Sequence, residues 1–165
     1  MNDELTLIRS KKTGILIRQM RENRGLSEQD CADWLGITLD NYQAMEIGEK
    51  CASLPQIESL SHYLSFPLQA FASMSASAQP QSKMPKKVNL DLVEVREKKI
   101  AILLKQELEK KGFSLQELSQ KSAIPVEELS AYMEEFERIP FSQLLSILAV
   151  LQTPLDQLFA AEAAV

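Results

Sequence analysis

The chain has 165 residues, of which 45% are hydrophobic and 6% aromatic, so it can bury a core. Only 5 glycines and 7 prolines favour helices over a sheet joined by tight turns. The net charge of −5 is the wrong sign for general attraction to nucleic acid, although a local basic patch can still bind it. Two cysteines and one histidine form no zinc-binding pattern, and we expect no metal or cofactor. We see no signal peptide and no apolar run of membrane-spanning length, so we expect a cytoplasmic protein.

The N-terminal region begins with a short mixed segment, residues 1–10, that we expect to fray. Residues 11–24 read as the first helix, because Ile15, Leu16 and Met20 recur at helical spacing. This is also the most basic part of the chain. Its cationic residues are Arg9, Lys11, Lys12, Arg18, Arg21 and Arg24. They form either a solvated helix face or a patch that contacts phosphate.

The next stretch contains two short helical patterns with a tight break between them. Ser27 is a favourable N-cap for the first, and Gly36 can end it in a left-handed conformation. Thr38 caps the second, which Gly48 ends. The predicted helices are residues 28–35 and 39–47. Two helices joined by about four residues that include a glycine predict a helix-turn-helix.

Two more helical patterns follow this unit. Ser53 caps a fourth helix with Pro55 in its first turn, and Pro67 begins a fifth. Trp34, near the end of the second helix, is either a partly buried anchor or an exposed contact for a partner.

The run GLSxxxxAxxLGIT that starts at Gly25, the Glu46-x-Gly48 motif and the trailing SLPQIESLSHYLSFPLQAF resemble the Cro/C1-type (XRE) helix-turn-helix family. The similarity covers about residues 12–72. The resemblance implies a lambda repressor-like domain of five short helices, whose third helix enters the major groove of double-stranded DNA.

The resemblance also implies which residues contact DNA. The base-facing positions carried onto this chain are Leu39, Asp40, Asn41 and Ala44. The expected phosphate-contacting positions are Lys11, Lys12, Arg18, Arg21, Thr38, Gln43 and Lys50. Among the residues of the third helix, only Asn41 and Gln43 are of the types that commonly read bases. The family often has Gln just after the capping serine, where this chain has Glu28.

The rest of the chain reads as a linker and a second copy of the first domain. Residues 73–92 are rich in Ser, Pro and Lys and read as a flexible linker. Residues 93–159 repeat the first domain, and an offset of 87 residues holds without a gap from Gly25 and Gly112 to Leu68 and Leu155. Matched pairs include Gly25 and Gly112, Ser27 and Ser114, Ile37 and Ile124, Ala44 and Ala131, and Pro67 and Pro154. We therefore predict an internal duplication, and an all-α protein of two tandem five-helix domains. In the second copy the first helix is expected over residues 94–111, and Ser114 can form a capping box with Glu117.

The second copy departs from the family pattern. Ala123 replaces the turn glycine, and the Glu-x-Gly motif is lost. Its third helix is acidic, so it would repel phosphate. The expected partner-binding residues on this copy are Glu127, Glu128, Tyr132 and Glu135. Net charges are −3 for residues 1–72, +2 for residues 73–92 and −4 for residues 93–165.

Two functions remain open at this point. One is a DNA-binding transcriptional regulator whose first domain, residues 1–72, contacts DNA and whose second domain, residues 93–165, serves dimerisation or binds a protein partner. The other is a protein-interaction adaptor built from two helix-turn-helix folds that no longer bind DNA. We expect no enzyme and no small-molecule substrate, because the sequence lacks a glycine-rich phosphate loop, a nucleophile elbow and a metal cluster.

Overall fold

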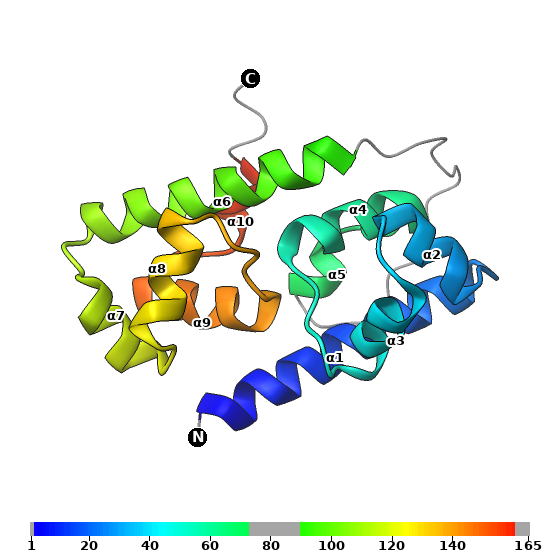
Figure 1. The fold of residues 1–165 in the computed structure, drawn as a ribbon, viewed down its shortest axis with the longest axis horizontal. Coiled ribbons are helices and arrows are strands. Elements are labelled where there is room, and N and C mark those ends of the chain that lie inside the picture. The colour runs from blue at the N-terminus through cyan, green and yellow to red at the C-terminus, as the bar shows by residue number, and fades with distance from the viewer. Residues whose placement is uncertain (1, 73–89, 161–165) are drawn as a thin grey trace.

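The computed structural model describes residues 2–72 and 90–160, and these residues form helices and no strand (Figure 1). Helices α1–α5 make up an N-terminal half and α6–α10 a C-terminal half. The bounds are α1 (Asn2–Asn23), α2 (Glu28–Leu35), α3 (Leu39–Ile47), α4 (Leu54–Leu64), α5 (Gln69–Ala72), α6 (Leu90–Lys110), α7 (Leu115–Ser122), α8 (Val126–Glu134), α9 (Phe141–Leu151) and α10 (Asp156–Ala160). Of the predicted linker, residues 73–89 lie outside the described part of the chain, and residues 90–92 are helical.

Serine side chains determine where three of the helices begin. Ser27, Ser53 and Ser114 each accept a hydrogen bond from the backbone N–H three residues on. The side chains of those third residues, Asp30, Gln56 and Glu117, in turn accept a hydrogen bond from the backbone N–H of the serine. This reciprocal pair completes a capping box at each site. The helices predicted over residues 28–35 and 39–47 have these bounds in the structure.

Helix α1 is longer than the sequence pattern predicts. It begins at Asn2, whereas we expected residues 1–10 to fray. The reason is a tertiary contact, because the N-terminal part of α1 lies against α9 of the other half (Figure 1). Arg9 Nη1 donates to Ser146 Oγ at 2.8 Å, and Ser10 Oγ lies 3.2 Å from Ser142 Oγ. Helix α6 likewise begins before the predicted residue 94.

The helices of the two halves recur at the offset of 87 residues found in the sequence. Helices α2 and α7, α3 and α8, and α4 and α9 have equivalent bounds at that offset. The left-handed turn residues recur as well, since Gly36 (φ 64°) corresponds to Ala123 (φ 56°) and Ser65 (φ 55°) to Gln152 (φ 50°). Each half thus has the same succession of a long helix, a helix-turn-helix pair, a fourth helix and a short fifth.

The two halves pack on each other in a reciprocal way. Helix α1 lies against α9, and its counterpart α6 lies against α4, the counterpart of α9 (Figure 1). At the centre, Ser53 and Pro140 form an antiparallel bridge, and Phe141 N donates to Ala52 O at 2.9 Å. Ser53 and Pro140 are themselves 87 residues apart. The interface is therefore approximately two-fold symmetric, with equivalent residues meeting at its centre.

Polar side chains link the halves around this centre. Ser53 Oγ donates to Glu97 Oε1 at 2.5 Å, and Arg96 Nη2 lies 2.9 Å from Glu58 Oε1. Ser53, Arg96 and Glu97 are all buried, so these contacts are shielded from solvent. The sequence allowed the halves many relative positions, whereas the structure holds them in one.

The buried hydrophobic side chains of both halves form one cluster. Trp34 is a partly buried anchor in it: its ring stacks on Tyr63 with centroids 4.1 Å apart, and its Nε1 donates to Ser59. Within the described ranges, no helix combines the length and the apolar character that crossing a bilayer needs.

Candidate nucleic-acid interface

Helices α2 and α3 form a helix-turn-helix whose turn is determined by two residues. Gly36 ends α2 in the left-handed region, and Thr38 caps α3 by accepting from Asn41 N. The first turn of α3 is accessible to solvent. Asp40 is exposed, and the other predicted base-facing residues, Leu39, Asn41 and Ala44, are partly exposed.

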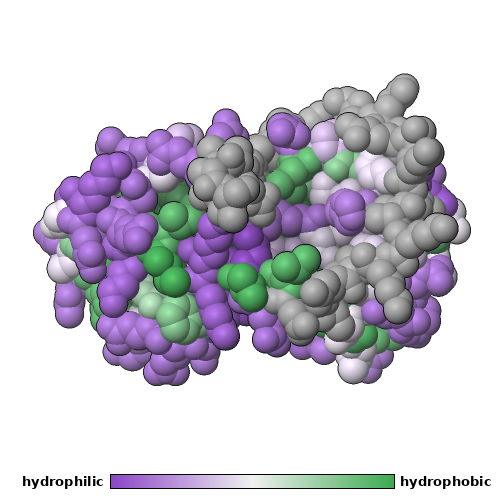
Figure 2. Space-filling view, turned by 90° about the horizontal axis from the view of Figure 1, so that it is seen from above, coloured by the Kyte–Doolittle hydropathy of each residue, from purple (hydrophilic) through white to green (hydrophobic). Residues whose placement is uncertain are grey.

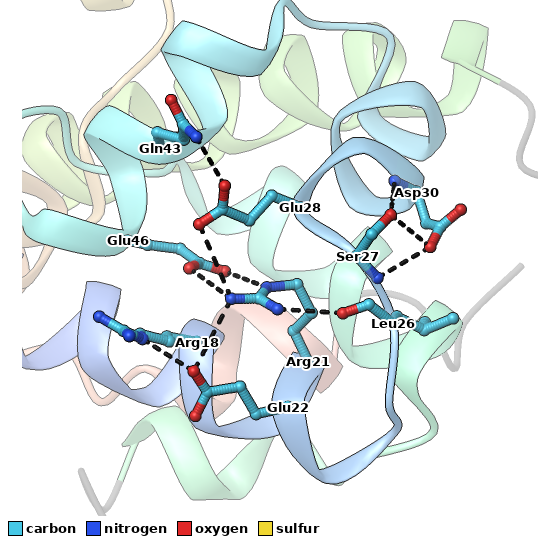
Figure 3. A network of polar contacts seen from close by, with 9 residues as sticks. All are labelled: Arg18, Arg21, Glu22, Leu26, Ser27, Glu28, Asp30, Gln43 and Glu46. Atoms are coloured by element: carbon cyan, nitrogen blue, oxygen red, sulfur yellow. Dashed lines mark hydrogen bonds and ion pairs between the residues drawn. The ribbon is translucent and has the colours of Figure 1, made fainter.

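Two amide side chains of α3, Asn41 of the predicted base-facing set and Gln43 of the predicted phosphate-contacting set, are each paired with a charged neighbour. Lys50 Nζ donates to Asn41 Oδ1 at 2.5 Å. Figure 3 shows the other pair, in which Gln43 Nε2 donates to Glu28 Oε2 at 2.6 Å. Both hydrogen bonds are exposed, and exposed polar pairs contribute little to stability. A ligand that offers equivalent partners can therefore replace them at small cost.

Arg21 occupies a different place from the one expected of a phosphate-contacting residue. It is buried, and its Nε and Nη2 donate to Glu46 Oε1 and Oε2 at 2.6 and 2.9 Å (Figure 3). Its Nη1 also donates to Leu26 O at 3.0 Å. The hydrogen bond to Glu46 raises the pKa of the Arg21 guanidinium. Arg21 therefore joins α1 to the end of α3, and this placement corrects its assignment to the DNA-facing surface.

Three cationic residues of α1 remain accessible from the set that the sequence predicted. Lys11, Lys12 and Arg18 are exposed, although Arg18 Nε lies 2.9 Å from Glu22 Oε1 on the next helical turn. Lys50, which follows α3, is also exposed. The other arginines of the segment have structural hydrogen bonds: Arg9 contacts Ser146, and Arg24 Nε donates to Leu64 O at 2.6 Å.

Two glycines that hold α1 close to α3 are central to this surface, and the sequence analysis missed one of them. A Cβ on Gly14 would lie 2.3 Å from Met45 O, so the α1 backbone directly touches the end of α3. A Cβ on Gly48 would lie 2.7 Å from Lys11 Cα. A glycine inside an otherwise regular helix is a signal of such close approach. The contact brings Lys11 beside the end of α3.

The equivalent surface of the C-terminal half is acidic. Glu127, Glu128 and Glu135, which were predicted to bind a partner, are exposed around α8. Tyr132, from the same predicted set, is buried, and its hydroxyl lies 2.5 Å from Gln143 Oε1. Burial raises the pKa of this hydroxyl. Tyr132 therefore packs within its own half and is not presented to a partner, which corrects that part of the prediction.

One family model matches the chain. Residues 104–164 match the model of the Cro/C1-type helix-turn-helix DNA-binding domain. The match falls on the C-terminal half and includes α7 and α8. The half that matches the family model is therefore the one whose equivalent surface is acidic. No curated protein and no solved structure matches the chain. In the described part of the chain, no group of His, Cys, Asp and Glu residues is arranged to hold a metal ion.

Proposed function

We propose that the chain is a DNA-binding transcriptional regulator made of two copies of a Cro/C1-type domain, residues 1–72 and 93–165. One observation carries the proposal. The family model matches α7 and α8 in the C-terminal half, and the same two helices recur 87 residues earlier as α2 and α3. A helix-turn-helix places its second helix in the major groove. The α3 surface has four cations beside it, Lys11, Lys12, Arg18 and Lys50, and of these only Lys50 is replaced by a carboxylate, Glu137, at the equivalent position of the other half.

The difference in charge between the two copies assigns DNA contact to the first. Lys50 beside α3 corresponds to Glu137 beside α8, and Asn41 corresponds to Glu128. Phosphate contacts supply most of the non-specific affinity for DNA, and carboxylates at these positions oppose it. In the first copy, Lys11, Lys12, Arg18, Thr38, Gln43 and Lys50 contact phosphates, and Leu39, Asp40, Asn41 and Ala44 face the bases.

In this proposal the second copy positions the first. Its α9 receives α1, so it fixes the N-terminal part of the helix that carries Lys11 and Lys12. Its exposed carboxylates, Glu127, Glu128 and Glu135, suit a basic protein partner. The second copy thus serves assembly or partner binding and not base reading.

A second candidate function is a protein-interaction adaptor without DNA binding. The observation that favours it is the pairing of both amide side chains, Asn41 with Lys50 and Gln43 with Glu28, together with exposed Asp40 on the same surface. An adaptor of this kind uses the same helices to bind proteins, and its contacts do not depend on polyanions.

Binding of the full chain to duplex DNA distinguishes the two functions. We expect fluorescently labelled genomic fragments to bind at low salt and Lys50→Glu to remove most of this binding. The matched variant Glu137→Lys, at the equivalent position of the second copy, should retain or increase binding. A wild-type chain that leaves every fragment free at micromolar concentration and low salt would contradict the regulator and favour the adaptor.

A further inference from the structure

Glu28 lies at the first residue of α2 and links that helix to α3. Its Oε2 accepts from Gln43 Nε2 at 2.6 Å, and its Oε1 lies 3.9 Å from Arg21 Nη2 (Figure 3). Hydrophilic side chains predominate among the coloured atoms of Figure 2, so a carboxylate at the surface is by itself ordinary on this protein. Glu28 is distinguished by its partner, because Gln43 is one of the residues that we propose to contact phosphate.

The ion pairs around Glu28 compensate its charge only in part. Arg21 donates through two nitrogens to Glu46, and Arg18 Nε lies 2.9 Å from Glu22 Oε1 (Figure 3). Each of these arginines therefore has a closer carboxylate partner than Glu28. Two cations face three carboxylates in this group, so Glu28 adds an excess negative charge beside α3.

The equivalent positions of the C-terminal half hold a different pair of residues. Glu28 corresponds to Leu115, and Gln43 corresponds to Ser130. Leu115 packs against the hydrophobic cluster, and Ser130 Oγ donates to Glu134 Oε2 at 3.0 Å within α8. A leucine side chain neither donates nor accepts a hydrogen bond, so the contact cannot form there. The pair of carboxylate and amide is thus a feature of the half to which we assign DNA contact.

The two amide side chains of α3 are held by neighbours of opposite charge. Asn41 accepts from Lys50, whose ammonium group attracts a phosphate that approaches it. Gln43 donates to Glu28 instead. A phosphate oxygen and a carboxylate oxygen that both accept from one amide nitrogen lie roughly 5 Å apart, and their charges repel. Breaking the exposed hydrogen bond costs little, but the carboxylate stays beside the amide and weakens its contact with phosphate.

We propose that Glu28 limits the affinity of the chain for DNA by holding the side chain of Gln43. This inference rests on the DNA binding proposed above, and Glu28 is a positioning residue in it, since it acts through Gln43. Phosphate contacts carry no direct information about base sequence, so Glu28 lowers the affinity for different duplexes alike. A glutamate at the start of α2 also interacts favourably with the helix dipole. Loss of that stabilisation cannot tighten DNA binding, so the two roles of the carboxylate are separable.

Fluorescence anisotropy of the full chain with two labelled duplexes of unrelated sequence tests this role. Glu28→Leu copies Leu115 of the other half and leaves the Gln43 amide free to donate. We expect it to bind both duplexes more tightly than the wild type, by about three- to tenfold, the range typical of one hydrogen bond to a charged group. In a chain that also carries Gln43→Ala, the same substitution should give little gain, because the amide that it frees is absent.

Asp33→Leu is the matched control. Asp33 is an exposed carboxylate of α2 that accepts from Gln29 Nε2 at 2.6 Å, so this variant loses the same charge and the same kind of pair away from α3. It should bind as the wild type does. Circular dichroism and urea denaturation will show that the variants keep their helices and remain folded.

Three results would overturn the inference while leaving the proposed DNA binding intact. The wild type binds, and Glu28→Leu binds no more tightly. Asp33→Leu gains as much as Glu28→Leu, which would mean that only the net charge matters. The gain from Glu28→Leu is the same with and without Gln43. A chain that leaves both duplexes free in every form would instead contradict the proposed DNA binding and this inference together.

Discussion

Arg21 and Glu46 form a buried ion pair, with Arg21 Nε 2.6 Å from Glu46 Oε1, that joins α1 to α3 in the N-terminal half. The residues at the equivalent positions of the C-terminal half are Leu108 and Met133, and both are buried. One site in the same fold is thus filled by an ion pair in one half and by two hydrophobic side chains in the other.

This comparison predicts how the ion pair responds to substitution. Glu46→Gln removes the buried carboxylate from the Arg21 guanidinium and leaves it only Glu22 and Glu28, each 3.9 Å away and more exposed. We therefore expect a loss toward the lower end of about 3–5 kcal/mol in the free energy of unfolding. The double variant Arg21→Leu with Glu46→Met copies the residues of the other half. We expect the free energy of unfolding of the double variant to lie within about 1 kcal/mol of the wild-type value or above it, because hydrophobic replacement of a buried ion pair is often neutral or stabilising.

Urea denaturation of the three proteins at one pH and salt concentration measures these differences. The account is contradicted if the double variant is destabilised as much as Glu46→Gln. That result would mean that the site depends on the charges themselves and not on filling the space between α1 and α3.

Gly14 controls the distance between α1 and α3. A methyl group there would meet Met45 O at 2.3 Å and Glu46 O at 2.6 Å, and neither backbone oxygen can move without shifting α3. We expect Gly14→Ala to lower the free energy of unfolding by about 1–3 kcal/mol, although alanine has a better helix propensity than glycine. Gln19→Ala, on the exposed face of the same helix, is the control and should stay within about 0.5 kcal/mol. Thermal melts suffice, and equal stability of the two variants would exclude the close contact.

Glu97 makes the packing of the two halves sensitive to pH. Burial raises the pKa of this carboxyl above its ordinary value of 4.5, while Ser53 and Arg138 oppose the shift. The folded protein therefore holds the proton more tightly than the unfolded chain. The stability that Glu97 contributes is present below the ordinary pKa and is lost as the pH rises through the raised one.

Glu97→Gln removes this dependence, because the amide does not titrate. We expect the stability of this variant relative to the wild type to increase between pH 4 and pH 7. Urea denaturation over this range gives the difference curve. A difference that stays flat, or that falls with pH, would show that the Glu97 pKa is not raised in the folded state.

The sequence predicted the local structure of this protein well. Capping serines and turn glycines have defined roles that depend on near neighbours, so Ser27, Gly36 and Thr38 were sufficient to place α2 and α3. The start of α1 was wrong because its N-terminal turns are stabilised by Ser142 and Ser146, which lie far away in the sequence.

The predicted site was less complete for the same reason. Arginine is a residue type that commonly contacts phosphate, so the sequence alone assigned Arg21 to the DNA-facing surface. Only the hydrogen bond to Glu46 in the structure shows that its side chain is buried. Tyr132 on α8 is similar, since its amphipathic side chain suits a surface until Gln143 is seen to accept from its hydroxyl. The reciprocal packing of the two halves had no local signal in the linker, although the offset of 87 residues already related Ser53 to Pro140.

The most direct test of the account is the salt dependence of DNA binding by the full chain in two matched variants. Lys11→Ala with Arg18→Ala removes cations from the proposed DNA-facing surface, and Lys98→Ala with Lys105→Ala removes those at the equivalent positions of the other half. We expect the first variant to bind more weakly than the wild type, with a salt slope shallower by about 1 for each lost phosphate contact. The second variant should match the wild type. Equal weakening in both variants, or no weakening in the first, would contradict the claim that only the N-terminal half presents its recognition helix to DNA.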